Sequence, residues 1–148
     1  MPLQIKRAAL EDVAAIAPLF DAYRMFYKQS SDIGAAAQFL NDRIILDESV
    51  IYFAETDGGV TGFCQLYPIF SSVSLKRAWL LNDLFVEPSA RGKGVATALL
   101  QAAKAFGWNT EAKWLLLQTG ADNKTAQAVY EKNGWQKVTD YFYEMSLS

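Results

Sequence analysis

Histidine is absent from this 148-residue chain, and cysteine occurs once, as Cys64. Without histidine, every Ser-His or Cys-His mechanism and most zinc sites are excluded, so a general acid or base must be Asp, Glu, Lys, Tyr or a chain terminus. A single cysteine excludes an intramolecular disulfide framework, and its apolar surroundings indicate a core residue rather than a nucleophile. We expect no bound metal ion.

Long apolar runs and an excess of positive charge are also missing. No apolar run reaches the ~18 residues that a membrane span needs, and no basic segment followed by an apolar one opens the chain. The formal net charge of −2 argues against the basic face that nucleic-acid binding requires. We therefore expect a soluble cytoplasmic protein with neither a membrane nor a nucleic acid as its partner.

The residues that are present suffice for a continuous core, because 51% of them are hydrophobic. We predict one domain over residues 1–148. The hydrophobic periods predict a first strand before Arg7, helices from 13 to 27 and from 32 to 44, and strands at 50–54, 60–67, 77–86 and 114–117. Pro68 is expected to interrupt the pairing of its strand.

The end of the chain is expected to hold a helix up to Lys132 and then two strands, at 135–138 and 141–147. The helix is expected to be capped by Asp122 or Asn123 and to end in a left-handed turn at Asn133-Gly134. With the helix after the glycine loop, the pattern predicts an α/β fold with four helices and a mixed sheet of about seven strands.

Residues 83–107 have the pattern of a strand, a tight loop with two glycines and a helix. The helix is indicated by one apolar stripe, formed by Ala96, Leu99, Leu100, Ala103 and Phe106. Its start places free backbone N–H groups at the positive end of a helix dipole, which is an anion site that a diphosphate fits.

Two common nucleotide loops do not match this segment. A Walker loop needs Lys and then Ser or Thr after its last glycine, whereas Val95 and Ala96 follow Gly94. A dinucleotide-binding fingerprint needs three glycines, and only Gly92 and Gly94 are present.

The spacing of Arg91, Gly94 and Ala96 resembles the signature loop of the GCN5-related N-acetyltransferase superfamily. A second motif is similar to the closing pattern of that family and consists of Asn123, Ala126, Tyr130, Lys132 and Gly134-Trp135. The order of the expected strands and helices is also that of the superfamily, so the resemblance covers nearly the whole chain.

The resemblance implies acetyl-coenzyme A as co-substrate. The pyrophosphate is expected on the amides of the loop, formed by Arg91, Gly92, Lys93, Gly94, Val95, Ala96 and Thr97. The pantetheine arm and the thioester are expected along the main chain of Leu84, Phe85 and Val86, with Asn123 as a further hydrogen-bond partner. Lys132 and Lys93 are expected to add charge near the phosphates, and Tyr130 to act as general acid toward the thiolate.

Within the superfamily, residues 65–72 and 80–86 look like the diamine and polyamine acetyltransferases and the yeast histone-and-polyamine acetyltransferase group. Their strand before the loop typically carries an acidic pair, but here Asn82 holds the first position and only Asp83 keeps a carboxylate. Asp83 is therefore a candidate catalytic residue, while the departure weakens the inference of a polyamine. The residues expected to bind the acceptor are Tyr23, Tyr27, Asn82, Asp83 and Tyr141.

The resulting expectation is an N-acetyltransferase that moves an acetyl group to a primary amine by direct attack in a ternary complex. The amine belongs to a small molecule or to a peptide. Two alternatives remain: a sensor that binds acyl-coenzyme A without turnover, and an interaction domain without a ligand. A homodimer is expected because the aromatic C-terminal strands could pair or swap between subunits.

Overall fold

The computed structural model describes residues 2–148. Its contacts divide the chain into two units, of which the first ends at Gln118 and the second spans Thr119–Ser148. A single domain over residues 1–148 stays a prediction.

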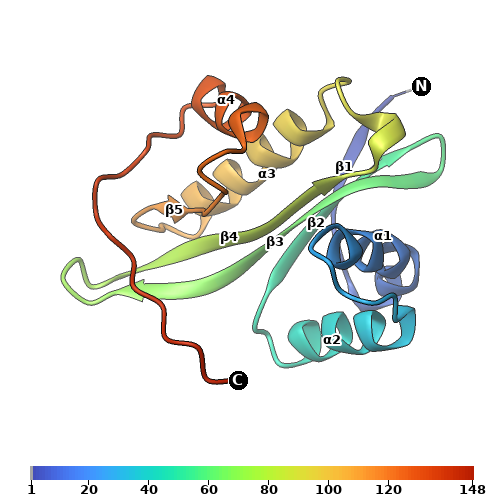
Figure 1. The fold of residues 1–148 in the computed structure, drawn as a ribbon, viewed down its shortest axis with the longest axis horizontal. Coiled ribbons are helices and arrows are strands. Elements are labelled where there is room, and N and C mark those ends of the chain that lie inside the picture. The colour runs from blue at the N-terminus through green and yellow to red at the C-terminus, as the bar shows by residue number, and fades with distance from the viewer. Residues whose placement is uncertain (1) are drawn as a thin grey trace. The chain divides into compact units, whose positions relative to one another are not determined.

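Residues 2–118 form one mixed sheet with five strands in the order β1-β2-β3-β4-β5 (Figure 1). The strands are β1 Gln4–Arg7, β2 Val50–Thr56, β3 Gly59–Ser71, β4 Lys76–Val86 and β5 Leu115–Leu116. The first four pair in antiparallel fashion, and β5 is parallel to β4. The strand predicted at 114–117 is thus present, although it is short and only half-buried.

The prediction of about seven strands is wrong, because residues 135–148 carry no strand in the described chain. An alternating apolar pattern gives a strand only when neighbouring backbone groups complete its hydrogen bonds. The aromatic side chains of this segment instead lie exposed, among them Tyr141, Phe142 and Tyr143.

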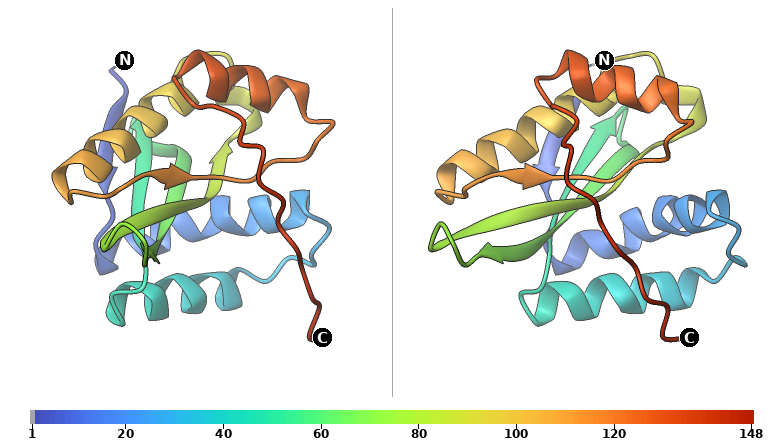
Figure 2. Two further views of the ribbon diagram at one scale, coloured as in Figure 1. Left: turned by 90° about the vertical axis from the view of Figure 1, so that its left-hand side faces the viewer. Right: turned by 60° about the vertical axis from the view of Figure 1, so that its left-hand side comes forward.

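Helices cover both faces of the sheet in the first unit (Figures 1 and 2). Helices α1 Val13–Phe26 and α2 Ile33–Ile45 lie on one face, and α3 Val95–Asn109 lies on the other. Because side chains alternate along a strand, Phe63 of β3 joins the core beneath α1 and α2, whereas its neighbour Cys64 joins the core beneath α3. Burial raises the pKa of the Cys64 thiol to about 12, so the cysteine is a core residue, as expected.

The connection between α1 and α2 is fixed by the buried Asp21. Its carboxylate accepts hydrogen bonds from the Ser31 hydroxyl and the Asp32 backbone N–H, both at 2.7 Å. These two donors lower the pKa of Asp21. Asp32 in turn caps α2 by accepting from the Ala35 N–H at 3.0 Å.

Pro68 does not interrupt its strand, contrary to the prediction. It lies within β3 and pairs in register with Trp79 of β4. The register between β2 and β3 ends at Val50 and Leu66, so β3 has lost one neighbour when Pro68 is reached. A proline that lacks an N–H is tolerated in such an edge position.

The second unit contains α4 Lys124–Lys132. Its cap is Asn123, whose side chain accepts from the Ala126 N–H at 3.2 Å. The helix ends where Gly134 adopts a φ of 92°, and the Trp135 N–H closes the turn on the Tyr130 carbonyl. The predicted helix and its left-handed end are confirmed. Across residues 2–148, no helix is long and apolar enough to cross a membrane.

Candidate functional site

The loop between β4 and α3 has the backbone geometry of an anion site. Gly92 and Gly94 have φ values of 76° and 85°, a left-handed conformation that glycine adopts without strain. The first hydrogen bond of α3 runs from the Ala98 N–H to the Gly94 carbonyl at 3.0 Å. The N–H groups of Val95 and Ala96, in the first turn, therefore have no acceptor within the helix.

The start of α3 is held close to the sheet by Gly62 of β3. A Cβ atom at this position would lie 2.8 Å from Val95 Cγ1 and 3.2 Å from both Leu99 Cδ1 and the Phe85 carbonyl oxygen. Only glycine allows this approach. The loop is anchored at its other end, where the Glu87 N–H donates to the Thr61 carbonyl at 2.8 Å.

The side chain of Arg91 folds back onto the strand that precedes the loop. Its Nε donates to the Val86 carbonyl at 3.0 Å, and its guanidinium lies 5.4 Å from the centre of the Phe85 ring. Arg91 thus ties the loop to the end of β4. Lys93, in contrast, lies exposed in the middle of the loop.

Strand β4 pairs with β5 over only part of its length. The register between the two strands comprises Trp79 with Leu115 and Leu80 with Leu116. Beyond Leu80, no further pair joins β4 to β5 among the described residues. The three predicted main-chain positions, Leu84, Phe85 and Val86, lie in this uncovered part of the strand.

Asp83 is the centre of a buried polar cluster on the face of α1. Its Oδ1 accepts from the Tyr23 hydroxyl at 2.7 Å and from Asn82 Nδ2 at 3.0 Å, and its Oδ2 accepts from Gln65 Nε2 at 2.7 Å. Asp83 is 5% exposed. The structure therefore brings together three of the predicted acceptor residues and adds Gln65, which the sequence had not indicated.

The local strand geometry explains how these side chains meet. Gln65 pairs with Asp83 across β3 and β4, but the next pair is Leu66 with Leu81. Asn82 is the extra residue of a β-bulge, a device that redirects side chains and is common beside active sites. It remains exposed while Asp83 is buried.

The carboxylate of Asp83 acts on the tyrosines around it. Burial and the negative charge of Asp83 raise the pKa of Tyr23, and the same two causes raise that of Tyr67 on β3. Both phenols are thus held in their protonated form. Tyr23 accordingly donates its proton to Asp83, and neither phenol is a base at neutral pH.

Aromatic rings extend this cluster toward the surface. The Tyr23 ring lies 5.2 Å from that of Tyr27 and 5.7 Å from that of Phe85, and Phe26 lies 6.1 Å from Phe85. Phe26 and Tyr27 are exposed. The faces of such rings attract cations, so the surroundings of Asp83 suit a positively charged ligand.

The remaining predicted residues belong to the second unit. Asn123 uses its side-chain oxygen as the cap of α4, and Lys132 lies in the last turn of that helix. The Tyr130 ring lies 6.3 Å from the Trp135 ring. Tyr141 lies outside regular secondary structure and is 87% exposed.

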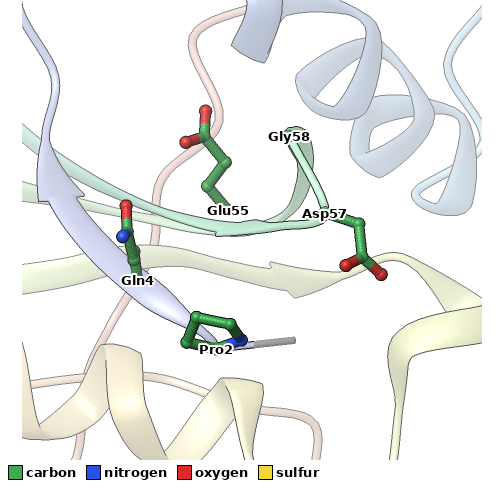
Figure 3. Close-up of a pocket in the computed structure, with 5 residues that line it drawn as sticks. All are labelled: Pro2, Gln4, Glu55, Asp57 and Gly58. Atoms are coloured by element: carbon green, nitrogen blue, oxygen red, sulfur yellow. The ribbon is translucent and has the colours of Figure 1, made fainter.

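A separate hollow of about 340 Å³ lies on β1 and β2 (Figure 3). It is lined by Pro2, Gln4, Glu55, Asp57 and Gly58. Its two carboxylates point in different directions in Figure 3, and Glu55 is paired with Lys6 at 2.8 Å. Nothing in this hollow converges on a reactive group. Within residues 2–148, no cluster of three His, Cys, Asp or Glu residues could hold a metal ion.

The sequence profile of the acetyltransferase (GNAT) family matches residues 16–135 of the chain. An uncharacterized N-acetyltransferase of Bacillus subtilis (strain 168), YhfO, is 50% identical over 141 residues, which cover 95% of each protein.

Solved structures give the same result for the fold. The crystal structure of a probable acetyltransferase is 43% identical and has a TM-score of 0.94, with 98% of both chains covered. A predicted acetyltransferase from Clostridium acetobutylicum, solved with acetyl-CoA, has a TM-score of 0.79 over 99% of this chain and 97% of its own. It is only 18% identical, so this second likeness concerns the fold alone.

Proposed function

The chain belongs to the acetyltransferase (GNAT) family, and from this premise we propose that it acetylates a small cationic primary amine. Acetyl-coenzyme A supplies the acetyl group as a thioester. Membership of the family and the names of the relatives support an acetyl-CoA-dependent N-acetyltransferase. The choice of a cationic amine rests on the residues around Asp83.

The loop of residues 91–97 fits the cofactor that the family uses. Its two left-handed glycines precede the first turn of α3, where backbone N–H groups lie at the positive end of the helix dipole, as an anion requires. Arg91 secures the loop, and exposed Lys93 adds positive charge. We assign the pyrophosphate to these groups and the pantetheine arm to the open part of β4.

The observation that carries the proposal is that β4 bears both halves of a site. Val86 and Leu84 pack beneath α3, next to the anion loop, whereas Phe85 packs beneath α1, next to the Asp83 cluster. One strand thus holds an anion site at its end and a negative, aromatic-lined cluster beside it. Such an arrangement suits a reaction in which two bound substrates meet directly.

Asp83 is assigned to binding and orienting the amine, rather than to removing its proton. Three hydrogen-bond donors already hold its two oxygens in place, as suits a group that binds and orients a ligand. An alkylamine has a pKa near ~10, so about one molecule in a thousand is neutral at pH 7. Catalysis should therefore rise with pH toward that value, with bulk water as the proton acceptor.

Tyr130 is proposed as the proton donor to the leaving thiol, and Asn123 as a partner of the pantetheine arm. The hydroxyl of tyrosine is protonated at neutral pH and can act as a general acid. A Tyr130→Phe variant should lose at least about tenfold in kcat while retaining its acetyl-CoA affinity. Unchanged kcat in this variant would remove Tyr130 from the mechanism.

The experiment for the function is a thiol-release assay with acetyl-CoA and a panel of alkylamines, diamines, polyamines, amino acids and a lysine peptide. Release with cationic amines is expected, because the Asp83 cluster offers them a negative charge and aromatic faces. The likeness of residues 65–86 to diamine and polyamine acetyltransferases favours these acceptors. Acetyl-CoA binding by calorimetry without release for any amine would support the acyl-CoA sensor instead.

A homodimer remains part of the proposal. The C-terminal segment supports this assignment, because apolar and aromatic side chains at every second position are more than 80% exposed. They are Tyr141, Tyr143, Met145 and Leu147. Such a segment is suited to pair with a second copy. Light scattering coupled to gel filtration measures the mass, and a monomer at micromolar concentration would contradict this assignment.

A further inference from the structure

Gln65 is a polar side chain in the interior of the sheet. It lies on β3 directly opposite Asp83, and none of its surface is exposed. Residues of this type are rarely buried unless all their polar atoms have partners. Its contacts therefore need an explanation.

One half of the Gln65 amide is satisfied and the other is not. Nε2 donates to Asp83 Oδ2 at 2.7 Å, but Oε1 has no hydrogen-bond partner among the described residues. Turning the amide over would not help, because it would place Oε1 against a carboxylate oxygen, and neither atom carries a proton. The contact with Asp83 thus fixes the orientation and leaves Oε1 without a donor.

Asp83 has spare capacity beside this atom. An ionised carboxylate has about four acceptor positions, and three of them are filled, two on Oδ1 and one on Oδ2. The described salt bridges join Lys6 to Glu55 and Arg43 to Glu48, and none reaches Asp83. A carboxylate without a described ion pair is therefore in direct contact with an amide whose oxygen has no donor.

A ligand that satisfies both groups must carry a positive charge and at least two N–H donors. An alkylammonium ion meets this description, whereas an alcohol lacks the charge and a quaternary ammonium lacks the donors. We propose that the side-chain oxygen of Gln65 is, together with Asp83, a ligand of the acceptor's ammonium group and selects amines with at least two N–H donors over dimethylated and trimethylated ones. This inference rests on the proposed function, since it assigns the acceptor to that site.

The approach of the amine is through Asn82. Of the three donors to Asp83, Asn82 is the exposed one, whereas Tyr23 is half-buried and Gln65 is fully buried. An ammonium that displaces the Asn82 amide from Oδ1 on entering can donate to the open acceptor position on Oδ2. Oδ2 is the oxygen that the Gln65 side chain already contacts.

The test is binding, measured by calorimetry in the presence of saturating coenzyme A, which carries no acetyl group. The probes are n-butylammonium and its N-methyl, N,N-dimethyl and N,N,N-trimethyl derivatives. All four carry one positive charge but offer three, two, one and no N–H donors. The wild-type protein should bind the primary ammonium about tenfold or more tightly than the trimethyl compound.

Gln65→Met removes the oxygen at nearly constant volume, and its discrimination between the four probes should fall to about twofold or less. A residue that only orients Asp83 would weaken all probes equally and leave the ratio intact, which would overturn the proposal. Leu66→Met is the matched control, because Leu66 is equally buried, adjacent and apolar; it should keep the wild-type ratio.

A second measurement needs no variant. The side-chain NH2 signals of Gln65 in 15N-labelled protein should shift saturably with n-butylammonium and much less with the trimethyl compound. Failure of the wild-type protein to discriminate between the probes, or to bind any of them, would overturn the assignment of Gln65. Failure of the proposed function is a separate result, because it would appear as a lack of thiol release from acetyl-CoA with every amine.

Discussion

The loop after β4 and the cluster around Asp83 adjoin the same strand but are built differently. The loop is made of main-chain N–H groups, supplied by consecutive residues and shaped by two left-handed glycines. The cluster is made of side chains from α1, β3 and β4, at positions 23, 65 and 83. The first half depends on local conformation, whereas the second depends on a fold that brings distant residues together.

The largest effect is expected from Asp83→Asn, which should damage the cluster alone. It removes the charge that the amine needs and places an amide donor among three donors, so kcat/KM for the amine should fall by about 100-fold or more. The Kd for acetyl-CoA should stay within about twofold. Steady-state kinetics and calorimetry measure the two quantities. Asp57→Asn, in an exposed turn, is the control. An equal loss of acetyl-CoA binding in Asp83→Asn would show that the loop and the Asp83 cluster do not act independently.

Gly94→Ala should damage the loop alone. A left-handed conformation costs an alanine about 1–2 kcal/mol, so we expect the Kd for acetyl-CoA to rise by about tenfold while butylammonium binding is retained. Gly58→Ala imposes the same strain, at a φ of 79° in the turn between β2 and β3. If both variants weaken acetyl-CoA binding equally, general destabilisation is the cause and the loop assignment is wrong.

A smaller effect is expected from Gly62→Ala. This variant tests whether the conformation of the loop depends on the close approach of α3 to β3. The new methyl group would press on Val95, so the free energy of unfolding should fall by about 1–3 kcal/mol and acetyl-CoA affinity by a few-fold. Urea denaturation and calorimetry check both. Gly34→Ala in α2, where the nearest atom would be 3.7 Å away, should be neutral or stabilising. An equally stable Gly62→Ala protein would show that α3 adjusts freely.

The smallest effect concerns the connection that holds the end of α1, and with it Tyr23, beside α2. The folded pKa of Asp21 lies below its ordinary value of 3.8, so its stabilisation is complete above that value and is lost as the pH falls through the folded pKa. Asp21→Asn should lower Tm at pH 7, and the gap to the wild type should close below about pH 4. A constant gap from pH 3 to pH 7 would contradict this role of the charge.

The sequence predicts the loop well because its determinants are local. Two glycines, a following apolar stripe and the spacing from Arg91 to Ala96 lie within one short segment, and the predicted helix follows them, from Val95 to Asn109. The role of Gly62 cannot be predicted in this way, because it depends on the distance between β3 and α3. Its signal is a lone glycine inside an otherwise apolar strand, which typically marks a close approach of backbone.

The cluster is only partly predictable, because its residues are distant in the sequence and meet only in the folded sheet. Tyr23, Asn82 and Asp83 can be proposed as a set, but their meeting with Gln65 requires the register of β3 and β4 and the bulge at Asn82. Gln65 could have been suspected as the only strongly polar residue between Phe63 and Leu66. The two C-terminal strands were wrongly predicted because alternation reports on side chains and not on whether a neighbouring strand is present.

The buried Cys64 has a practical consequence for all these experiments. Thiol reagents attack the thiolate, and a thiol with no exposed surface and a pKa of about 12 is almost never in that form at pH 8. The folded enzyme should therefore add no background when released coenzyme A is titrated with a chromogenic disulfide. Because this cysteine is the sole protein thiol, a slow signal without both amine and acetyl-CoA would measure how often the sheet separates from α3, so the same reagent would report both turnover and local unfolding.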